Sequence, residues 1–522
     1  MQSIYIAMDG LYTQFTTLVG GVDIFYSLIC GSMVLLMQCG FILNCIGSCL
    51  RFPPDLRKIP DVLLKHFAAS FSAMIGFWSI GFGLAFQRGR FFGFSGERFF
   101  LQDYSNYIDF FYQSTFALTV TSIVIGTVVT TSPLGRCKTI GCILYAFFLT
   151  AFVYPVVVHA IWNDEGFLSA FSEDPPGGEG MIDFAGSGVV HVTGGATALV
   201  ATVILRRVQS RNTWMSSGGA NEAVPFSSTP SPSVFAYLPH CSMLLQVLGT
   251  FTLWIGWYGF NAGSTLAISP PGYGDAAALC AVTTTLSATC GGLTCMFFDA
   301  LVGFSGGYYG TTRKRRGVNV HHEQQQEHVD DDHNASLFLE YDVSMAMKGC
   351  LSGLVAITAG CSVVEPWAAC VIGCISGIVF ILSSKVLGIK FININDSMGS
   401  ISIHLFNGMW GCIATGIFAA PRHVKNAFAF DARYSGLLYV NSSNGVLFIN
   451  EILGIVFILA WTIGTMTCFF VLLHRMGLLC NNDYASAIVA SSENDGLVLN
   501  NEEEEEEEHQ QGILGEETEM LT

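Results

Sequence analysis

Charged residues are scarce in this sequence. Asp, Glu, Lys and Arg make up 12% of the 522 residues, against 51% that are apolar. A soluble domain cannot hide so large an apolar share from water, so a soluble enzyme is excluded and no nucleic-acid partner is expected. No Lys or Arg precedes Arg51, so the chain lacks the basic start of a cleaved signal peptide.

Basic residues are also absent after Arg475, where a run of glutamates gives the chain much of its formal charge of −17. Such a segment cannot bury a core, and we expect a solvated, disordered acidic tail. The C-x2-C spacing that is typical of zinc modules is missing too, although the chain has 17 Cys. The cysteines fall in or beside apolar runs, which indicates small membrane-helix residues rather than a zinc module or a disulfide framework. We expect no metal, no cofactor and no enzymatic activity.

Long apolar runs dominate what is present. A helix of about 20 apolar residues crosses the hydrocarbon core of a bilayer. Eleven runs of that kind follow one another. We therefore predict an all-α polytopic membrane protein with eleven transmembrane helices in contact with membrane lipid. The expected spans are residues 25–47, 64–86, 107–131, 138–161, 184–205, 236–260, 275–304, 343–362, 366–387, 396–420 and 446–474.

The basic residues indicate an orientation, because cytoplasmic flanks of membrane proteins are enriched in Lys and Arg. With the N-terminus outside, only six of the 23 Lys and Arg residues fall on the outer side, namely Arg88, Arg90, Arg98, Arg422, Lys425 and Arg433. We therefore expect an outer N-terminus and a cytoplasmic C-terminus.

Polar loops divide the chain into parts. Residues 216–233 are rich in Ser, Gly and Pro, which is typical of a linker. His321, His322, His328 and His333 lie in a polar insertion without fixed ligand spacing, and we interpret it as a solvated loop rather than a metal site. Asn441 begins an Asn-Ser-Ser glycosylation sequon. The expected parts are an extracellular N-terminus at 1–24, a first five-helix half at 25–205, a cytoplasmic linker at 206–235, a second five-helix half at 236–420 with a cytoplasmic insertion at 311–339, a last helix at 446–475 and the acidic cytoplasmic tail at 476–522.

One pattern containing a histidine occurs twice at a constant offset. Asp183, Gly186, Ser187, His191, Gly195, Ala201 and Thr202 recur as Asp396, Gly399, Ser400, His404, Gly408, Ala414 and Thr415. An odd number of helices per half makes the second half enter the membrane from the opposite side. The repeat therefore predicts a five-plus-five inverted architecture, as in many transporters.

Both histidines are predicted to lie near the middle of the membrane. Each follows its aspartate by about eight residues, or roughly 12 Å of helix, in a core about 30 Å thick. An ionisable group at that depth is costly unless paired, so we expect His191 and His404 to face each other or a shared cavity. The alternative is that each bonds a neighbouring helix. Asp183 and Asp396 are interpreted as helix N-caps rather than proton carriers.

Several segments of the sequence resemble those of a known family. Asp183-Phe-Ala-Gly-Ser-Gly-Val-Val-His191 and Trp257-Tyr-Gly-Phe-Asn-Ala-Gly-Ser264 are similar to signature stretches of the ammonium transporter family (Amt/Mep/Rh), especially its plant-like Amt branch. Further matches are Tyr112-Gln-Ser-Thr-Phe116-Ala and Trp410-Gly-Cys-Ile-Ala-Thr-Gly-Ile-Phe418. The resemblance covers about residues 25–475. It implies a plasma-membrane ammonium transporter that forms a homotrimer with a pore in each subunit.

The resemblance also implies roles for single residues. Trp162, Ser264 and Phe116 correspond to an outer site that recruits ammonium. Phe116 and Phe260 correspond to a stacked pore gate, with Tyr112 and Trp257 beside it. His191 and His404 correspond to the pore lining, and Asp183 to a structural residue near the site. Leu405 stands where family members commonly have a glycine after the second histidine.

The chemistry of these residue types agrees with that substrate. An aromatic face attracts the charge of NH4+ and a hydroxyl accepts one of its N–H groups. A bare cation in a narrow apolar pore is prohibitive, whereas neutral ammonia beside an imidazole is tolerable. We therefore expect recruitment of NH4+, deprotonation and passage of NH3, with methylammonium as an analogue. The alternatives are an ammonium sensor that signals through the cytoplasmic loop and tail, and a facilitator of neutral gas or water.

Overall fold

The structure is a computed structural model that describes most of the apolar body of the chain. The described residues are 2–50, 56, 58–94, 96–131, 137–172, 174–216, 232–302, 341–389, 392, 394, 396, 398–428, 435–439 and 445–480. The expected insertion at 311–339, the sequon at Asn441 and the acidic tail beyond residue 480 lie outside the described residues.

The described part of the chain is helical, and within it the only extended pairing is three isolated bridges. Ten of its helical stretches are long and apolar enough to cross a membrane. They are Met8–Cys49, Lys58–Phe86, Tyr104–Thr130, Thr139–Trp162, Ser187–Leu205, Cys241–Thr265, Tyr273–Leu301, Pro366–Gly388, Ile401–Phe418 and Val446–Arg475. The protein is thus a multi-pass membrane protein whose described residues form an all-helical fold.

The elements follow one another with few breaks. The first half contains α1 (Gln2–Cys49), α2 (Lys58–Gly76), η1 (Phe77–Gly81), α3 (Phe82–Phe86), α4 (Tyr107–Thr131), α5 (Thr139–Phe148), η4 (Leu149–Val153), α6 (Tyr154–Trp162), η6 (Ser187–Val192) and α7 (Thr193–Ser216). The second half contains α8 (Pro232–Asn261), α9 (Tyr273–Val302), α10 (Val343–Ile357), α11 (Pro366–Gly388), η8 (Ile401–Phe406), α12 (Asn407–Phe418), α13 (Pro421–Phe428) and α14 (Val446–Arg475).

The expected span at 343–362 corresponds to α10, an apolar helix of 15 residues that ends at Ile357. It ends there because a distant segment satisfies the backbone groups that follow. Ser187 Oγ donates to the Val355 carbonyl at 2.7 Å and accepts the Ala359 N–H at 2.8 Å. The Phe184 N–H donates to the Ala359 carbonyl at 3.0 Å. A helix end that is buried needs such partners.

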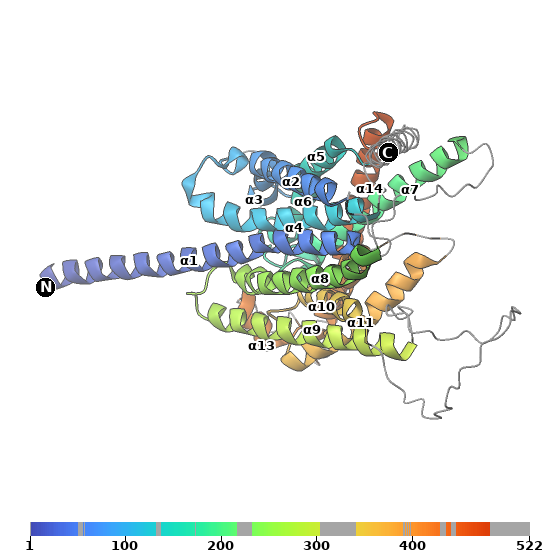
Figure 1. The fold of residues 1–522 in the computed structure, drawn as a ribbon. Coiled ribbons are helices and arrows are strands. Elements are labelled where there is room, and N and C mark those ends of the chain that lie inside the picture. Colours follow the sequence, from blue (N-terminus) through green and yellow to red (C-terminus); the bar gives the residue numbers. More distant parts are fainter. Residues whose placement is uncertain are drawn as a thin grey trace, which may run out of the picture.

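Glycines allow neighbouring helices to approach closely. The helix α1 packs along α8, and its N-terminal end extends beyond the bundle (Figure 1). At their crossing, a Cβ on Gly40 would lie 2.8 Å from the Gly249 carbonyl oxygen, and a Cβ on Gly249 would lie 2.8 Å from that of Gly40. Only glycine fits at both positions. Close packing of this kind is a main source of helix association inside a membrane.

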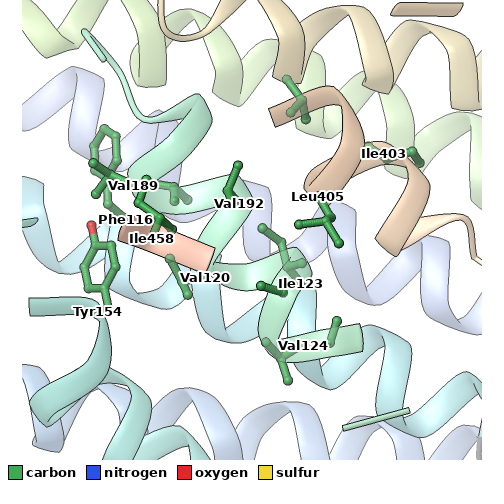
Figure 2. Packing of buried hydrophobic residues seen from close by; sticks show 14 of the residues in the cluster. Phe116, Val120, Ile123, Val124, Tyr154, Val189, Val192, Ile403, Leu405 and Ile458 are labelled. Carbon is green, nitrogen blue, oxygen red and sulfur yellow. The ribbon is translucent and has the colours of Figure 1, made fainter. Parts of the chain in front are cut away.

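The buried centre of the bundle joins elements that are far apart in the sequence. Figure 2 shows Phe116 from α4, Tyr154 from α6, Val189 from η6, Leu405 from η8 and Ile458 from α14 in one cluster. These side chains hold η6 and η8, the two elements that carry the repeated histidines, inside the bundle.

Candidate functional site

His191 and His404 contact each other at the centre of the bundle. Their Nδ1 atoms are 3.1 Å apart and their ring centroids 5.1 Å, with the rings 19° from parallel. Both side chains are buried, His191 completely and His404 with 6% of its surface exposed. Two imidazole nitrogens at this distance share one hydrogen bond, so in the neutral pair one Nδ1 carries a proton and the other accepts it.

The repeated sequence pattern gives the same local structure twice. Asp183 accepts the N–H groups of Gly188 at 2.9 Å and Val189 at 2.8 Å. Asp396, at the equivalent offsets, accepts those of Ile401 at 3.2 Å and Ser402 at 2.9 Å. Each carboxylate thereby satisfies N–H groups that have no partner at the start of a helix.

A glycine in the left-handed region follows each aspartate, with φ of 99° at Gly186 and 79° at Gly399. Only glycine adopts this conformation without strain, which explains its place in both copies of the pattern. The chain then turns directly into the helix that carries the histidine.

Both histidines lie in π-helical turns, His191 in η6 and His404 in η8. A π turn contains an extra residue relative to an α turn and often occurs at functional sites. The wider turn leaves some backbone groups without their usual α-helical partners. Asn407 compensates in part, because its side-chain amide donates to the Ser402 carbonyl at 3.0 Å.

Aromatic rings continue from the histidine pair toward one end of the bundle. The Trp257 ring is 5.3 Å from that of His191 and 16° from parallel. The Phe260 ring is 5.7 Å from that of His191. Phe116 in turn lies 4.1 Å from Phe260, ring centroid to ring centroid. All of these aromatic side chains are buried, so they form a closed apolar column above the histidines.

A partly open group of residues lies beyond this column. The Trp162 ring meets the edge of Phe116 at 5.8 Å and 88°, and its Nε1 donates to the Asp183 carbonyl at 2.6 Å. Ser264 Oγ donates to the Phe260 carbonyl at 2.7 Å. Because the serine proton is used there, the oxygen keeps its lone pairs for an incoming N–H donor.

Tyr112 closes one side of this group. Its hydroxyl donates to the Gly259 carbonyl at 2.9 Å and lies 3.5 Å from Ser264 Oγ. The structure thus brings all of the candidate residues from the sequence into one continuous set, which runs from Trp162 and Ser264 to His404.

A cavity opens on the other side of the histidine pair. Its lining includes Phe41, Asn44, Thr250, Trp257, Lys348 and His404. The rings of Phe41 and His404 are 6.3 Å apart. The lining of this cavity, called the inner cavity, is therefore more polar than the aromatic column. The cationic Lys348 is a residue that the sequence reasoning missed.

Sequence reasoning also missed two residues that support the site. Thr358 Oγ1 accepts the indole N–H of Trp257 at 3.0 Å and so fixes the ring that stacks on His191. Glu451, buried in α14, accepts the Ile182 N–H at 2.9 Å, immediately before Asp183. A carboxylate inside an apolar span is itself a signal of function, and it could have pointed to Glu451.

Asp183 itself is buried without a basic partner among the described residues. Burial raises the pKa of Asp183 to about 6, although the N–H groups of Val189 and Gly188 lower it. Burial disfavours the charged form and hydrogen bonds to the carboxylate favour it. Protonation of Asp183 is therefore coupled to its hydrogen bonds at the start of the helix.

The relatives of this sequence agree with the site. The sequence pattern of the Ammonium Transporter Family matches residues 25–303 and 338–487. The chain belongs to this family. It is 32% identical to Ammonium transporter 1 member 2 of Arabidopsis thaliana over 440 residues, which cover 81% of this chain and 74% of that protein. The resemblance expected from the signature segments is confirmed.

The relatives of this chain are not limited to plant proteins. The chain is 31% identical to Ammonium transporter Amt2 of Archaeoglobus fulgidus over 432 residues, covering 80% of this chain and 76% of that protein. The crystal structure of Mep2 from Saccharomyces cerevisiae has a TM-score of 0.63 with 24% identity, and the match covers 88% of each chain. This structural similarity shows that the chain shares the fold of Mep2.

Proposed function

We propose that this protein is an ammonium transporter that recruits NH4+ at Trp162, Ser264 and Phe116. One proton of the bound ion passes to water at this partly open group, and NH3 is conducted past His191 and His404. The observation that carries the proposal is the contact between His191 and His404 at 3.1 Å, directly beneath the aromatic column. The outer residues that bind a cation and the histidine pair that passes only a neutral molecule thereby lie on one path.

The outer group suits a cation with N–H donors. Trp162 and Phe116 offer aromatic faces, which attract positive charge. Ser264 offers an oxygen whose own proton is bonded to the Phe260 carbonyl. Potassium can also bind aromatic faces, but it donates no hydrogen bond and loses no proton.

The buried aromatic column supplies the selectivity for ammonia over bare cations. The rings of Phe116 and Phe260 are 4.1 Å apart, so they must separate before a molecule passes. A bare cation in such an apolar passage loses its hydration without compensation. Ammonia, in contrast, is neutral, and it can accept from or donate to the imidazole atoms below.

The histidine pair is suited to receive ammonia. Since one Nδ1 donates to the other, one Nε2 carries a proton and the other has a free lone pair. His191 Nε2 has no hydrogen-bond partner within the described part of the chain. It is therefore available to a molecule arriving from the aromatic column.

We further propose the architecture and setting of the transporter. The turn after α10 completes an eleventh crossing, and the two five-helix halves form an inverted repeat, supported by the matched Asp183 and Asp396 caps. The protein is a homotrimer of the plasma membrane, with its N-terminus outside and one pore in each subunit.

The function can be tested with the full chain in proteoliposomes. Uptake of [14C]methylammonium and ammonium-driven current are recorded together, with protein-free liposomes as the control. The proposal predicts saturable uptake that excess ammonium inhibits. Absence of both uptake and current in correctly inserted protein would overturn it.

A further inference from the structure

A cysteine, a histidine and a methionine contact one another beside the inner cavity, and they have no part in the proposed pore. They are Cys45 on α1, His66 on α2 and Met398, which precedes η8. Cys45 Sγ lies 3.2 Å from His66 Nε2 and 3.5 Å from Met398 Sδ. Cys45 and His66 are fully buried, with 0% and 1% of their surfaces exposed. Met398 lines the inner cavity together with His404.

Hydrogen bonding alone gives little reason for this arrangement. A thiol has a single weak donor, and a thioether is only a weak acceptor. Met398 is 353 positions from Cys45 in the sequence, yet its sulfur reaches the thiol. On the neighbouring α4, Gly126 leaves room at the two sulfurs, since a Cβ there would lie 3.2 Å from Cys45 Sγ and 3.5 Å from Met398 Sδ.

The distances agree with ligands of one metal ion. With bonds of about 2.3 Å to sulfur and about 2.0 Å to nitrogen, as for zinc, ligand atoms at a bond angle of about 100° are roughly 3.3 to 3.5 Å apart. The observed separations of 3.2 and 3.5 Å are close to these values. Small rotations of the side chains would widen these separations to those of trigonal coordination.

The ligand set selects the kind of ion. Thiolate and thioether sulfur favour soft ions such as Cu(I), and imidazole binds copper well. The cysteine loses its proton when it binds a metal. A monovalent ion with one thiolate is neutral overall, whereas a divalent ion would leave a net positive charge in a buried place, which is costly.

We propose that Cys45, His66 and Met398 form a binding site for one soft monovalent d10 cation of the Cu(I) or Ag(I) type, which enters from the inner cavity. Within the described residues, no three His, Cys, Asp or Glu side chains gather in a way that could hold a metal. The methionine is therefore essential to the site. A bound ion would link α1, α2 and the segment that leads into η8.

The test uses the purified full chain in detergent, loaded with Cu(I) under reducing, anaerobic conditions. The protein is then equilibrated with the Cu(I) chelator bicinchoninate, which removes ions held by single thiols, and retained copper is counted. We expect one Cu(I) per chain in the wild type. Met398→Leu, His66→Leu and Cys45→Ser should each lower the affinity by at least about tenfold, because even partners outside the ligand shell change metal affinity by that much.

Two matched controls lie outside the cluster. Met476→Leu and Cys468→Ser change an exposed methionine and an exposed cysteine, and both should retain copper as the wild type does. Met398→Leu conserves volume and apolar character, so it should fold. X-ray absorption of the wild-type complex, which needs no variant, should show one nitrogen and two sulfur ligands.

Wild-type copper affinity in Met398→Leu, or a spectrum with sulfur ligands only, would overturn the site. The readout is retained metal rather than transport. A negative result would therefore leave the proposed ammonium transport standing.

Discussion

His404 Nδ1 lies 3.1 Å from His191 Nδ1, although the two residues are 213 positions apart in the chain. One shared proton joins the rings, so a change at one imidazole alters the tautomer of the other. The histidines therefore act as one element of the pore, with the rings of Trp257 and Phe260 stacked on His191.

Thr358 holds the tryptophan that stacks on His191. Thr358→Val keeps the shape of the side chain but removes the acceptor of the buried Trp257 N–H. An unpaired buried donor costs about 1 to 3 kcal/mol, so the melting temperature should fall and methylammonium uptake should decrease. Thr358→Ser keeps the hydroxyl and should remain close to wild type. Equal uptake in Thr358→Val and Thr358→Ser would contradict this role.

Gly195 allows η8 to approach α7 directly after His404. A Cβ on Gly195 would lie 2.8 Å from both Cα and Cβ of Leu405. Gly195→Ala should therefore displace η8, at about 1 to 3 kcal/mol of stability, and reduce uptake. In Gly194→Ala the new Cβ would lie 3.1 Å from Ile123 Cδ1 and 3.2 Å from Ile123 Cβ, which is a milder contact than that at Gly195. This matched variant should keep most of its uptake, and an equal loss in both variants would refute the explanation.

Asp183 links stability to pH. Burial raises its pKa from 3.8 to about 6. Between these values the folded chain binds more protons than the unfolded chain, so the free energy of unfolding falls as pH rises from about 4 to about 6, and then levels off. The measurement is the melting temperature of wild type minus that of Asp183→Asn across this range. A difference that increases with pH would have the wrong sign.

Glu451 anchors the segment that leads into Asp183. Glu451→Gln keeps an oxygen that can accept the Ile182 N–H, so its stability should match that of wild type. Glu451→Leu removes the acceptor and should cost about 1 to 3 kcal/mol. Thermal unfolding of the two variants separates the hydrogen bond from the charge. A Gln variant as unstable as the Leu variant would show that the charge itself is required.

Much of this arrangement could be predicted from the sequence. The apolar runs predicted helical membrane spans because the bilayer sets their length. The repeated Asp, Gly and His positions pointed to two equivalent helix starts, and His191 and His404 are the residues that the structure brings into contact. Such features depend on residue type and spacing, which the sequence contains.

Other features depend on tertiary contacts and could not be predicted. The end of α10 at Ile357 results from hydrogen bonds to Ser187 and Phe184, which are distant in the chain. The π-helical turns at the histidines change the backbone hydrogen-bond register without a distinct composition. Leu405 fits after His404 because Gly195, on another helix, provides the space.

The most direct test of the central claim is ion discrimination by the histidine pair. Ammonium-driven and potassium-driven currents, with methylammonium uptake, are recorded for wild type, His191→Ala, His404→Ala and the double variant in proteoliposomes. If the pair passes only the neutral molecule, wild type excludes potassium and the double variant loses this discrimination. Unchanged exclusion of potassium by a correctly inserted double variant, with unchanged uptake, would contradict the account.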